Sequence, residues 1–250
     1  MEESQKGFWN TLKAQWYKKG LRYSTLPKIA LNIILPKTKG CKTFLDIGSG
    51  CGTLAIPLAK AGKQVTALDS SPAMIRLLSE EIKKKRLKNI KPIHSAWGEI
   101  EIKPHDVIIC ANVPELLKDS KTFLKEANEF ARKAVFLIEG ADPHADKFYY
   151  KELYPRLFNK PFLPRADYLK TYTDLHSLGI FANIEIIEYN FDQPFDDMNE
   201  ALEFWKEYIG IVTGEHDEKL RNFLKGKLER FKGGLIARFQ KKSAVIWWKK

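Results

Sequence analysis

The stretch Phe44–Thr53 reads Phe-Leu-Asp-Ile-Gly-Ser-Gly-Cys-Gly-Thr. Apolar residues interrupted by one acid, Asp46, lead into a loop with glycine at every second position, and an apolar helical pattern follows from Leu54. This pattern predicts a strand, a tight turn and the start of a helix. The three glycines permit backbone angles with positive φ and leave the amides at the helix start open to a ligand.

The spacing of these glycines separates two kinds of adenosine ligand. A dinucleotide loop has the pattern G-x-G-x-x-G, whereas here the third glycine comes one residue early and Thr53 stands where the last glycine belongs. The segment D-I-G-S-G-C-G instead resembles motif I of the class I S-adenosylmethionine (SAM) dependent methyltransferases. SAM carries no phosphate, and a carboxylate suits its α-ammonium. The resemblance implies that the methionine end of SAM is held by Asp46, Gly48, Ser49 and Gly50.

A second acid follows the next predicted strand. Asp69 comes directly after Gln64–Leu68, and an acid at this position of a doubly wound fold can accept both hydroxyls of a ribose. The residues Ser70-Ser71-Pro72 predict the start of a helix. The pattern D-x-S-P-x-M also resembles the methyltransferase family, which implies that Asp69 binds the ribose and that Ser70 and Met74 line the cofactor site.

The loops after the third and fourth strands complete the expected site. The resemblance implies that Ala96 and Trp97, which follow the strand 90–94, line the adenine. After the fourth strand the chain reads Asn-Val-Pro-Glu from Asn112, where family members that methylate amino groups often carry N-P-P-[YF]. The differences at the second and fourth positions argue against an amino-group acceptor of that kind. Asn112 is still expected near the sulfonium.

Strand and helix patterns alternate along the chain, which is typical of an α/β fold with a parallel sheet covered on both faces. The resemblance implies a doubly wound, seven-stranded, mostly parallel Rossmann-like sheet of order 3-2-1-4-5-7-6 with strand 7 antiparallel. We expect N-terminal helices, and a helical insertion near 197–209 and 215–230 before the last strand, 243–248. We expect one methyltransferase domain, 1–250, composed of an N-terminal helical lid (1–40), a SAM-binding half (41–140) and a substrate-side half (141–250).

Two aromatic segments flank the glycine loop. Residues 6–23 carry aromatic side chains at helical spacing up to Gly20, and residues 140–165, rich in proline and aromatic residues, are predicted to form a substrate lid. The candidate substrate-binding residues are Trp16, Tyr17, Tyr23, Tyr149 and Tyr154, although packing against the core explains their spacing equally well. The candidates for a general base are His144 and Tyr150, and neither has an identified partner.

The composition argues against several other classes of protein. A chain of 250 residues can bury one good core, and its three scattered cysteines and five dispersed histidines predict neither a disulfide framework nor a metal site. With a polar N-terminus and no apolar run long enough to span a membrane, we expect a cytoplasmic protein without a membrane partner. The net charge of +11 is concentrated in residues 1–40, but most lysines are interleaved with acids, which favours a solvated surface over a nucleic-acid interface.

The resemblance implies an enzyme, a SAM-dependent methyltransferase that uses in-line displacement. The aromatic segments favour a small-molecule acceptor. The alternatives are an RNA or protein methyltransferase, a nicotinamide-dependent dehydrogenase, and a SAM-binding protein without catalysis. Neither the acceptor atom nor the oligomeric state follows from the sequence.

Overall fold

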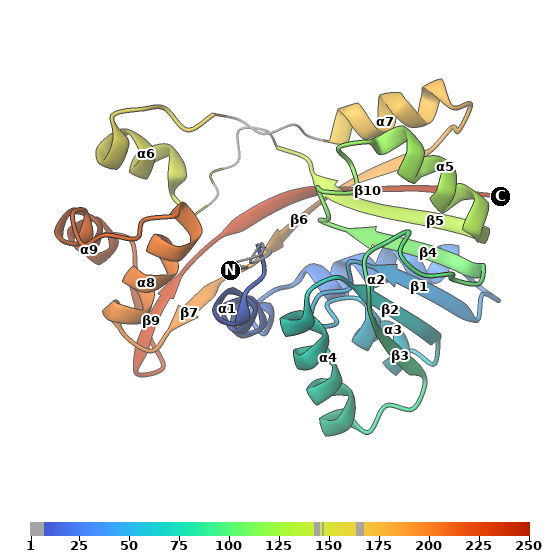
Figure 1. Ribbon diagram of the computed structural model, residues 1–250, viewed down its shortest axis with the longest axis horizontal. Coiled ribbons are helices and arrows are strands. Elements are labelled where there is room, and N and C mark those ends of the chain that lie inside the picture. Colours follow the sequence, from blue (N-terminus) through green and yellow to red (C-terminus); the bar gives the residue numbers. More distant parts are fainter. Residues whose placement is uncertain (1–7, 143–145, 147, 164–167) are drawn as a thin grey trace, which may run out of the picture.

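The computed structural model describes residues 8–142, 146, 148–163 and 168–250. Its larger sheet is built from β1 (Thr43–Ile47), β2 (Gln64–Asp69), β3 (Ile90–His94), β4 (His105–Ala111), β5 (Ala131–Gly140), β6 (Asn183–Asn190) and β10 (Gln240–Lys249). The strand order is β3-β2-β1-β4-β5-β10-β6, and β10 runs antiparallel to both neighbours while the other pairs are parallel (Figure 1). The expected order and the antiparallel last strand are therefore confirmed.

Helices cover both faces of this sheet. One face carries α2 (Leu26–Lys37), α3 (Ala55–Lys60) and α4 (Pro72–Lys85), and the other carries α5 (Ser120–Phe130) and α7 (Tyr168–Ser177). Successive residues of a strand point to opposite faces, so Phe44 enters the first core and Leu45 the second. Burial on both faces explains why the central strands read as nearly continuous apolar runs.

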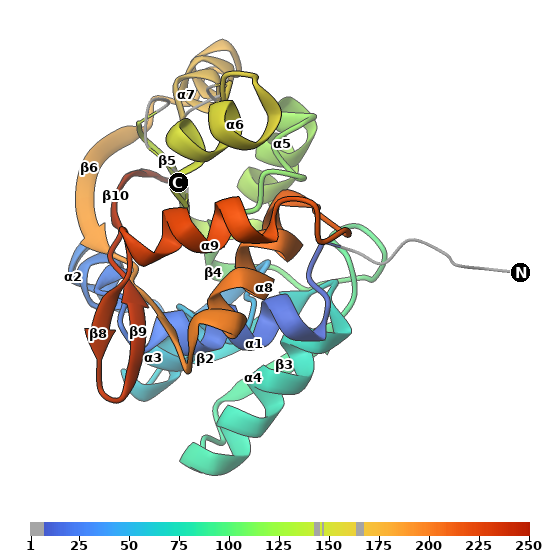
Figure 2. The ribbon, with the colours of Figure 1, turned by 90° about the vertical axis from the view of Figure 1, so that its left-hand side faces the viewer.

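A second group of elements, the helical lobe, lies beside the sheet. It contains α6 (Tyr150–Phe158), α8 (Met198–Ile209), α9 (Asp217–Lys225) and a small sheet of β7 (Gln193–Phe195), β9 (Gly234–Ala237) and β8 (Glu229–Phe231) (Figure 2). The helices α8 and α9 are the expected insertion. The second one ends at Lys225 rather than near 230, because the chain there enters β8, which the sequence did not predict.

The first helix, α1 (Thr11–Leu21), joins the two parts. Trp16 packs on Phe204 of α8 with ring centroids 5.3 Å apart. The helix begins at Thr11, and the side chain of Asn10 caps it by accepting the Lys13 N–H at 2.9 Å. The helix ends at Leu21, one residue after Gly20, where the pattern predicted its end. A Cβ at Gly20 would lie 2.6 Å from Oε1 of Gln193, so glycine allows α1 to approach β7.

The two regions that flank β5 also differ from expectation. From the sequence we expect a helix over 116–130 before β5. The observed helix, α5, begins only at Ser120, because the N–H groups of Leu116 and Leu117 bond to the carbonyls of Val113 and Pro114 in turns. The described part of the aromatic segment 140–165 forms α6 and packs into the core of the helical lobe. Within the described ranges, no helix has the length and apolar character needed to cross a membrane.

Candidate functional site

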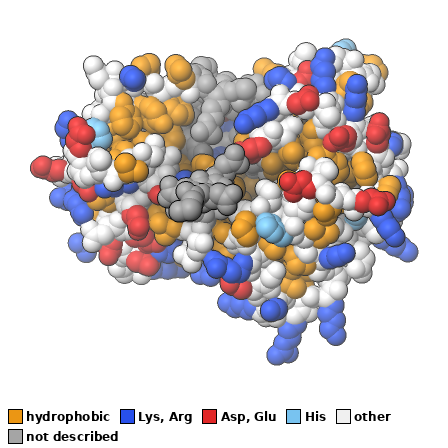
Figure 3. Space-filling view, in the orientation of Figure 1, with side chains coloured by type: hydrophobic (Ala, Val, Ile, Leu, Met, Phe, Trp, Pro, Cys, Tyr) orange, Lys and Arg blue, Asp and Glu red, His pale blue; other side chains and the backbone are white. Residues whose placement is uncertain are grey.

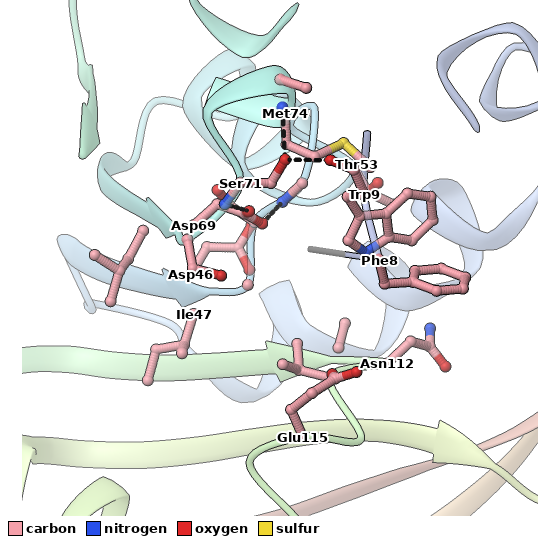
Figure 4. Close-up of a pocket in the computed structure, with 18 of the residues that line it drawn as sticks. Phe8, Trp9, Asp46, Ile47, Thr53, Asp69, Ser71, Met74, Asn112 and Glu115 are labelled. Atoms are coloured by element: carbon pink, nitrogen blue, oxygen red, sulfur yellow. Dashed lines mark hydrogen bonds between the residues drawn. The ribbon is translucent and has the colours of Figure 1, made fainter. Parts of the chain in front are cut away.

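A cavity of about 1050 Å³ lies at the carboxyl ends of β1, β2 and β4. Its walls come from the loops after β1, β3 and β4, the first turn of α4 and the segment before α1 (Figure 4). Ligands of open α/β sheets bind at this edge. The volume slightly exceeds the ~300–1,000 Å³ typical of small-molecule sites, which leaves room for a nucleoside cofactor and a second small molecule.

The glycine loop after β1 is shaped for close approach. Gly48 has φ +68°, and a Cβ there would lie 2.2 Å from Cγ2 of Val113, so only glycine lets this turn pack on the loop after β4. Gly50 has φ +56°, and the atom nearest to its absent Cβ is Sδ of Met74 at 3.9 Å. The loop therefore leaves open space beside Gly50 in the cavity wall.

Asp69 connects the glycine loop to the start of α4. Its Oδ2 accepts the Gly50 N–H and its Oδ1 accepts the Ser71 N–H, each at 2.8 Å. Burial raises the pKa of this carboxyl, and the two backbone donors oppose the rise. A carboxylate has about four acceptor positions, so each oxygen retains a lone pair for a hydroxyl donor from a ligand.

Asp46 lines the cavity, and one of its carboxylate oxygens accepts no hydrogen bond. Its Oδ2 and the Oγ of Ser49 are buried and have no hydrogen-bond partner among the described residues. Burial raises the pKa of Asp46 to about 7, the Ala55 N–H opposes the rise, and the charge of Asp69 adds to it. Buried polar atoms without partners are rare in folded proteins. A ligand that brings an ammonium to this position would supply the missing donor, so the site fits the methionine end of SAM.

The segment before α1 forms the aromatic wall of the cavity. Phe8 and Trp9 line it, and the Trp9 carbonyl accepts a hydrogen bond from Oγ of Ser71 at 3.0 Å. The Trp9 ring packs edge to face on Tyr17 at 5.3 Å, and the Tyr17 hydroxyl lies 3.0 Å from Oγ1 of Thr53. Sequence reasoning placed Phe8 and Trp9 in a helix and did not predict them here. The available signal was the asparagine at position 10, because a helix cap there leaves the preceding aromatic residues outside the helix.

All ten candidate cofactor residues line this one cavity: Asp46, Gly48, Ser49, Gly50, Asp69, Ser70, Met74, Ala96, Trp97 and Asn112. A hydrogen bond holds the Trp97 indole in position, since its Nε1 donates to Oε2 of Glu126 in α5 at 2.6 Å. Asn112 has φ +56°, a conformation that non-glycine residues rarely adopt and that is often found at functional sites. Glu115 and Arg76 also line the cavity and were not predicted.

Of the candidate substrate residues, only Tyr17 lines the cavity. Trp16 is buried in the helical lobe and donates its Nε1 to Oε1 of Glu200 at 3.1 Å, while Tyr23 packs against Phe231. The structure also packs the tyrosines of the second aromatic segment in the helical lobe, away from the cavity, because they build a separate apolar core: Tyr149, Tyr150 and Tyr154.

The sequence offered two candidates for a general base, and neither is seen at the cavity in the described structure. Tyr150 is buried in the helical lobe and does not reach the cavity, and His144 lies outside the described residues. Among the described side chains, no group of three or more His, Cys, Asp or Glu residues gathers as a metal site would require.

Comparison with known proteins agrees with this geometry. A family model described as a methyltransferase domain matches residues 45–134. An uncharacterized protein of Haemophilus influenzae is 28% identical over 214 residues, covering 83% of this chain and 76% of its own length. A probable ribosomal RNA small subunit methyltransferase A of Methanosphaera stadtmanae is 34% identical over 111 residues, covering 44% of this chain and 40% of that protein.

Solved structures share the fold. A putative methyltransferase from Bacillus halodurans superimposes with a TM-score of 0.57 at 17% identity, covering 89% of this chain and 98% of that one. Three findings support the same assignment: the matched domain, the strand order, and the glycine loop with its two acids. Residues 45–134 match a methyltransferase domain, and the chain has the Rossmann-like fold of the class I SAM-dependent methyltransferases, enzymes whose methyl donor is SAM.

Proposed function

We propose that the protein transfers the methyl group of SAM to a small-molecule acceptor. The observation that carries this proposal is the aromatic wall of Phe8, Trp9 and Tyr17, which lines the cavity beside the glycine loop. SAM supplies a methyl group on a sulfonium, which is a good leaving group. The protein's own task is to hold an acceptor in line with that methyl and to exclude water.

We assign the donor side of the cavity from its polar groups. Asp69 accepts the ribose hydroxyls on the lone pairs that the backbone donors leave free. Asp46 accepts the α-ammonium on its unpaired Oδ2, beside the open face of Gly50. Ala96 and Trp97 lie beyond Asp69 and provide an apolar wall for the adenine.

The charges of α1 support a small acceptor over a nucleic acid. Lys13 pairs with Glu207 at 3.4 Å, Lys18 with Glu81 at 3.2 Å and Lys19 with Glu200 at 2.7 Å. The basic N-terminal helix is thus largely neutralised by its neighbours. Acidic and basic side chains are also mixed over the face of the molecule seen in Figure 3.

RNA methylation is the second candidate, favoured by the ribosomal RNA methyltransferase name of the Methanosphaera relative. A run of basic residues, 83–86, also closes α4. If RNA is the acceptor, binding to bulk tRNA will weaken steeply as salt rises, because each neutralised phosphate releases counterions. Salt-independent or absent tRNA binding favours the small molecule.

The donor assignment is tested by titrating purified protein with S-adenosylhomocysteine (SAH) in a calorimeter. We expect Asp69→Ala to weaken binding about 100-fold, since two hydrogen bonds to a charged group contribute about 1.5 kcal/mol each. Asp106→Ala is a matched control, because Asp106 also accepts two backbone N–H groups, from Lys42 at 2.7 Å and Thr43 at 3.1 Å, at the opposite edge of the sheet. Full SAH affinity in Asp69→Ala, or binding of NADH in place of SAH, would contradict the assignment.

The acceptor class is tested by turnover. Release of SAH from SAM is measured with a panel of small aromatic and aliphatic alcohols, thiols and amines, and with tRNA. Turnover with tRNA alone would overturn the small-molecule proposal, and binding of SAM without turnover on any acceptor would favour a non-catalytic role.

A further inference from the structure

Glu115 is a charged residue of the cavity wall that the donor assignment does not use. It lies in the loop after β4, three residues past Asn112, and its side chain is exposed. The Leu116 N–H bonds to the Val113 carbonyl at 3.2 Å, which places Glu115 at the bend of a turn. Figure 4 shows Glu115 and Asn112 on one side of the cavity, with the Phe8 ring toward them. The Glu115 carboxylate therefore lies beside the aromatic wall proposed for the acceptor.

The charge of Glu115 is not compensated within the protein. Among the described residues, none forms a hydrogen bond or an ion pair with its carboxylate. Water solvates this carboxylate while the cavity is empty of acceptor. A ligand that fills the space beside the wall displaces that water, and a carboxylate that loses water without gaining a partner costs free energy. The acceptor that fits best therefore brings a donor or a positive charge to Glu115.

The balance of charge in the cavity also favours a positive acceptor. Three acids and one base are the charged residues among the described part of the lining: Asp46, Asp69, Glu115 and Arg76. SAM carries two positive groups, its α-ammonium and its sulfonium, and one carboxylate. With the donor bound and all four side chains ionised, the lining and the donor together keep one negative charge in excess. An acceptor with one positive charge neutralises this excess, whereas an acid adds to it.

Arg76 does not serve as the counter-ion of Glu115. It lies in α4, four residues after Pro72 and on the same face of that helix. The helix start belongs to the donor side, since the Ser71 N–H donates to Oδ1 of Asp69 at 2.8 Å. Among the described side chains, no ion pair joins Arg76 to any carboxylate. The one basic residue of the described lining is thus held by a different element from Glu115, and the two charges stay apart.

The aromatic wall suits the same kind of ligand. The rings of Phe8 and Trp9 pack edge to face at 5.0 Å, and the faces of such rings attract an ammonium. The ammonium of Lys13 already lies 4.7 Å from the centroid of the Phe8 ring. Lys13 also pairs with Glu207 at 3.4 Å, so its own charge is compensated and does not repel a cation at Glu115.

We propose that Glu115 binds an ammonium group of the methyl acceptor, whose apolar body lies against Phe8 and Trp9. This inference rests on the proposed function and names its substrate class: a small organic cation. Glu115 is then a specificity-determining residue, since a neutral analogue would leave its carboxylate unpaired. An ammonium that stays protonated has no lone pair with which to attack a methyl group, so Glu115 recognises the acceptor and takes no part in the transfer.

The test measures binding to protein saturated with SAH by calorimetry at about pH 7.5, where an alkylamine is protonated. The probes are benzylamine, benzyl alcohol and benzoate, which share a ring and differ in charge. We expect benzylamine to bind at least about tenfold more tightly than either of the others. Glu115→Gln removes the charge and keeps the shape. It should lose about tenfold in benzylamine affinity and keep the wild-type affinity for benzyl alcohol.

Asp119→Asn provides the matched control. Asp119 is an exposed acid of the same loop, its side chain forms no capping hydrogen bond, and it does not line the cavity. Its removal should leave the affinity for benzylamine unchanged, and a loss equal to that of Glu115→Gln would show a general effect of negative charge and refute a direct contact.

Three other results would overturn the inference: equal affinity for the three probes, no binding of benzylamine to the wild type, or unchanged benzylamine affinity in Glu115→Gln. Tighter binding of benzoate that is lost in Arg76→Met would assign an acidic acceptor to Arg76 instead. SAH affinity is measured first in every variant. Loss of SAH binding by the wild type would refute the donor assignment, whereas intact SAH binding without a preference for benzylamine refutes only the role of Glu115.

Discussion

The carboxyl of Asp46 provides the sharpest test of the cavity's electrostatics. It is 2% exposed and its Oδ2 has no partner in the described structure. Burial raises its pKa from the ordinary 3.8 to about 7. An acid whose pKa is higher in the folded state stabilises the fold below its unfolded pKa. That stability is lost as pH rises toward the folded pKa, so ionised Asp46 destabilises the unliganded protein at neutral and alkaline pH.

The substitution Asp46→Asn removes the charge and keeps the shape. One pKa unit corresponds to about 1.4 kcal/mol, so ionised Asp46 costs about 4 kcal/mol above pH 7. Any cost of burying the asparagine amide does not depend on pH. The free energy of unfolding of Asp46→Asn relative to wild type should therefore rise by about 3 kcal/mol between pH 5 and pH 8 and then level off. At about 2–4 °C per kcal/mol, the relative Tm should rise by roughly 6–12 °C.

The assay is urea unfolding of the ligand-free protein at several pH values, with Asp106→Asn as a control of opposite sign. Two backbone N–H groups lower the pKa of Asp106, against the effect of desolvation, so its substitution should destabilise the protein at neutral pH and have less effect as pH falls below 4. If the difference between Asp46→Asn and wild type does not change from pH 5 to pH 8, Asp46 is not a desolvated carboxyl, and the reasoning fails.

Three further outcomes are expected. SAH binding to wild type at about pH 6 should release a proton, seen as a dependence of the calorimetric enthalpy on the buffer, and Asp46→Asn should release none. Gly48→Ala should destabilise the protein by about 2 kcal/mol more than Gly62→Ala in urea unfolding, since both have positive φ but only the Gly48 side chain would meet Val113; equal losses would contradict the packing argument. Trp16→Ala should cost about 3–5 kcal/mol of stability yet keep SAH affinity, because Trp16 is buried outside the cavity; a large loss of affinity would return Trp16 to the site.

The donor side of the fold could be predicted from sequence because its signals are local. Each of the segments Phe44–Thr53 and Gln64–Met74 contains a strand, the turn after it and the polar residues at its end. Parallel strands then bring these ends together without further information. The resemblance to a known family supplied the strand order, which spacing alone did not determine.

The structure differs from the sequence-based prediction where contacts between residues far apart in the chain determine the local structure. Gly20 lies where the sequence predicts the end of a helix, but its close approach to Gln193 of β7, which leaves no room for a side chain, could not be predicted. The strand β8 has three residues, too few for a periodic signal, and exists because β9 pairs with it. Tyr149 and Trp205 stack at 5.9 Å, although they are far apart in the chain, so an aromatic segment expected at the substrate site builds a second core.

The difference between local signals and long-range contacts also separates the two sides of the cavity. The residues proposed for the donor follow from sequence motifs, whereas those proposed for the acceptor are inferred from the structure. The donor side rests on strand ends of the main sheet, and these positions follow once the sheet forms. The wall proposed for the acceptor comes from Phe8 and Trp9 before α1 and from Tyr17 within it. These pieces meet only because α1 is held between the sheet and the helical lobe. The shape of this wall is therefore decided by contacts between residues that lie far apart in the sequence, and the acceptor that fits it has to be inferred from the structure.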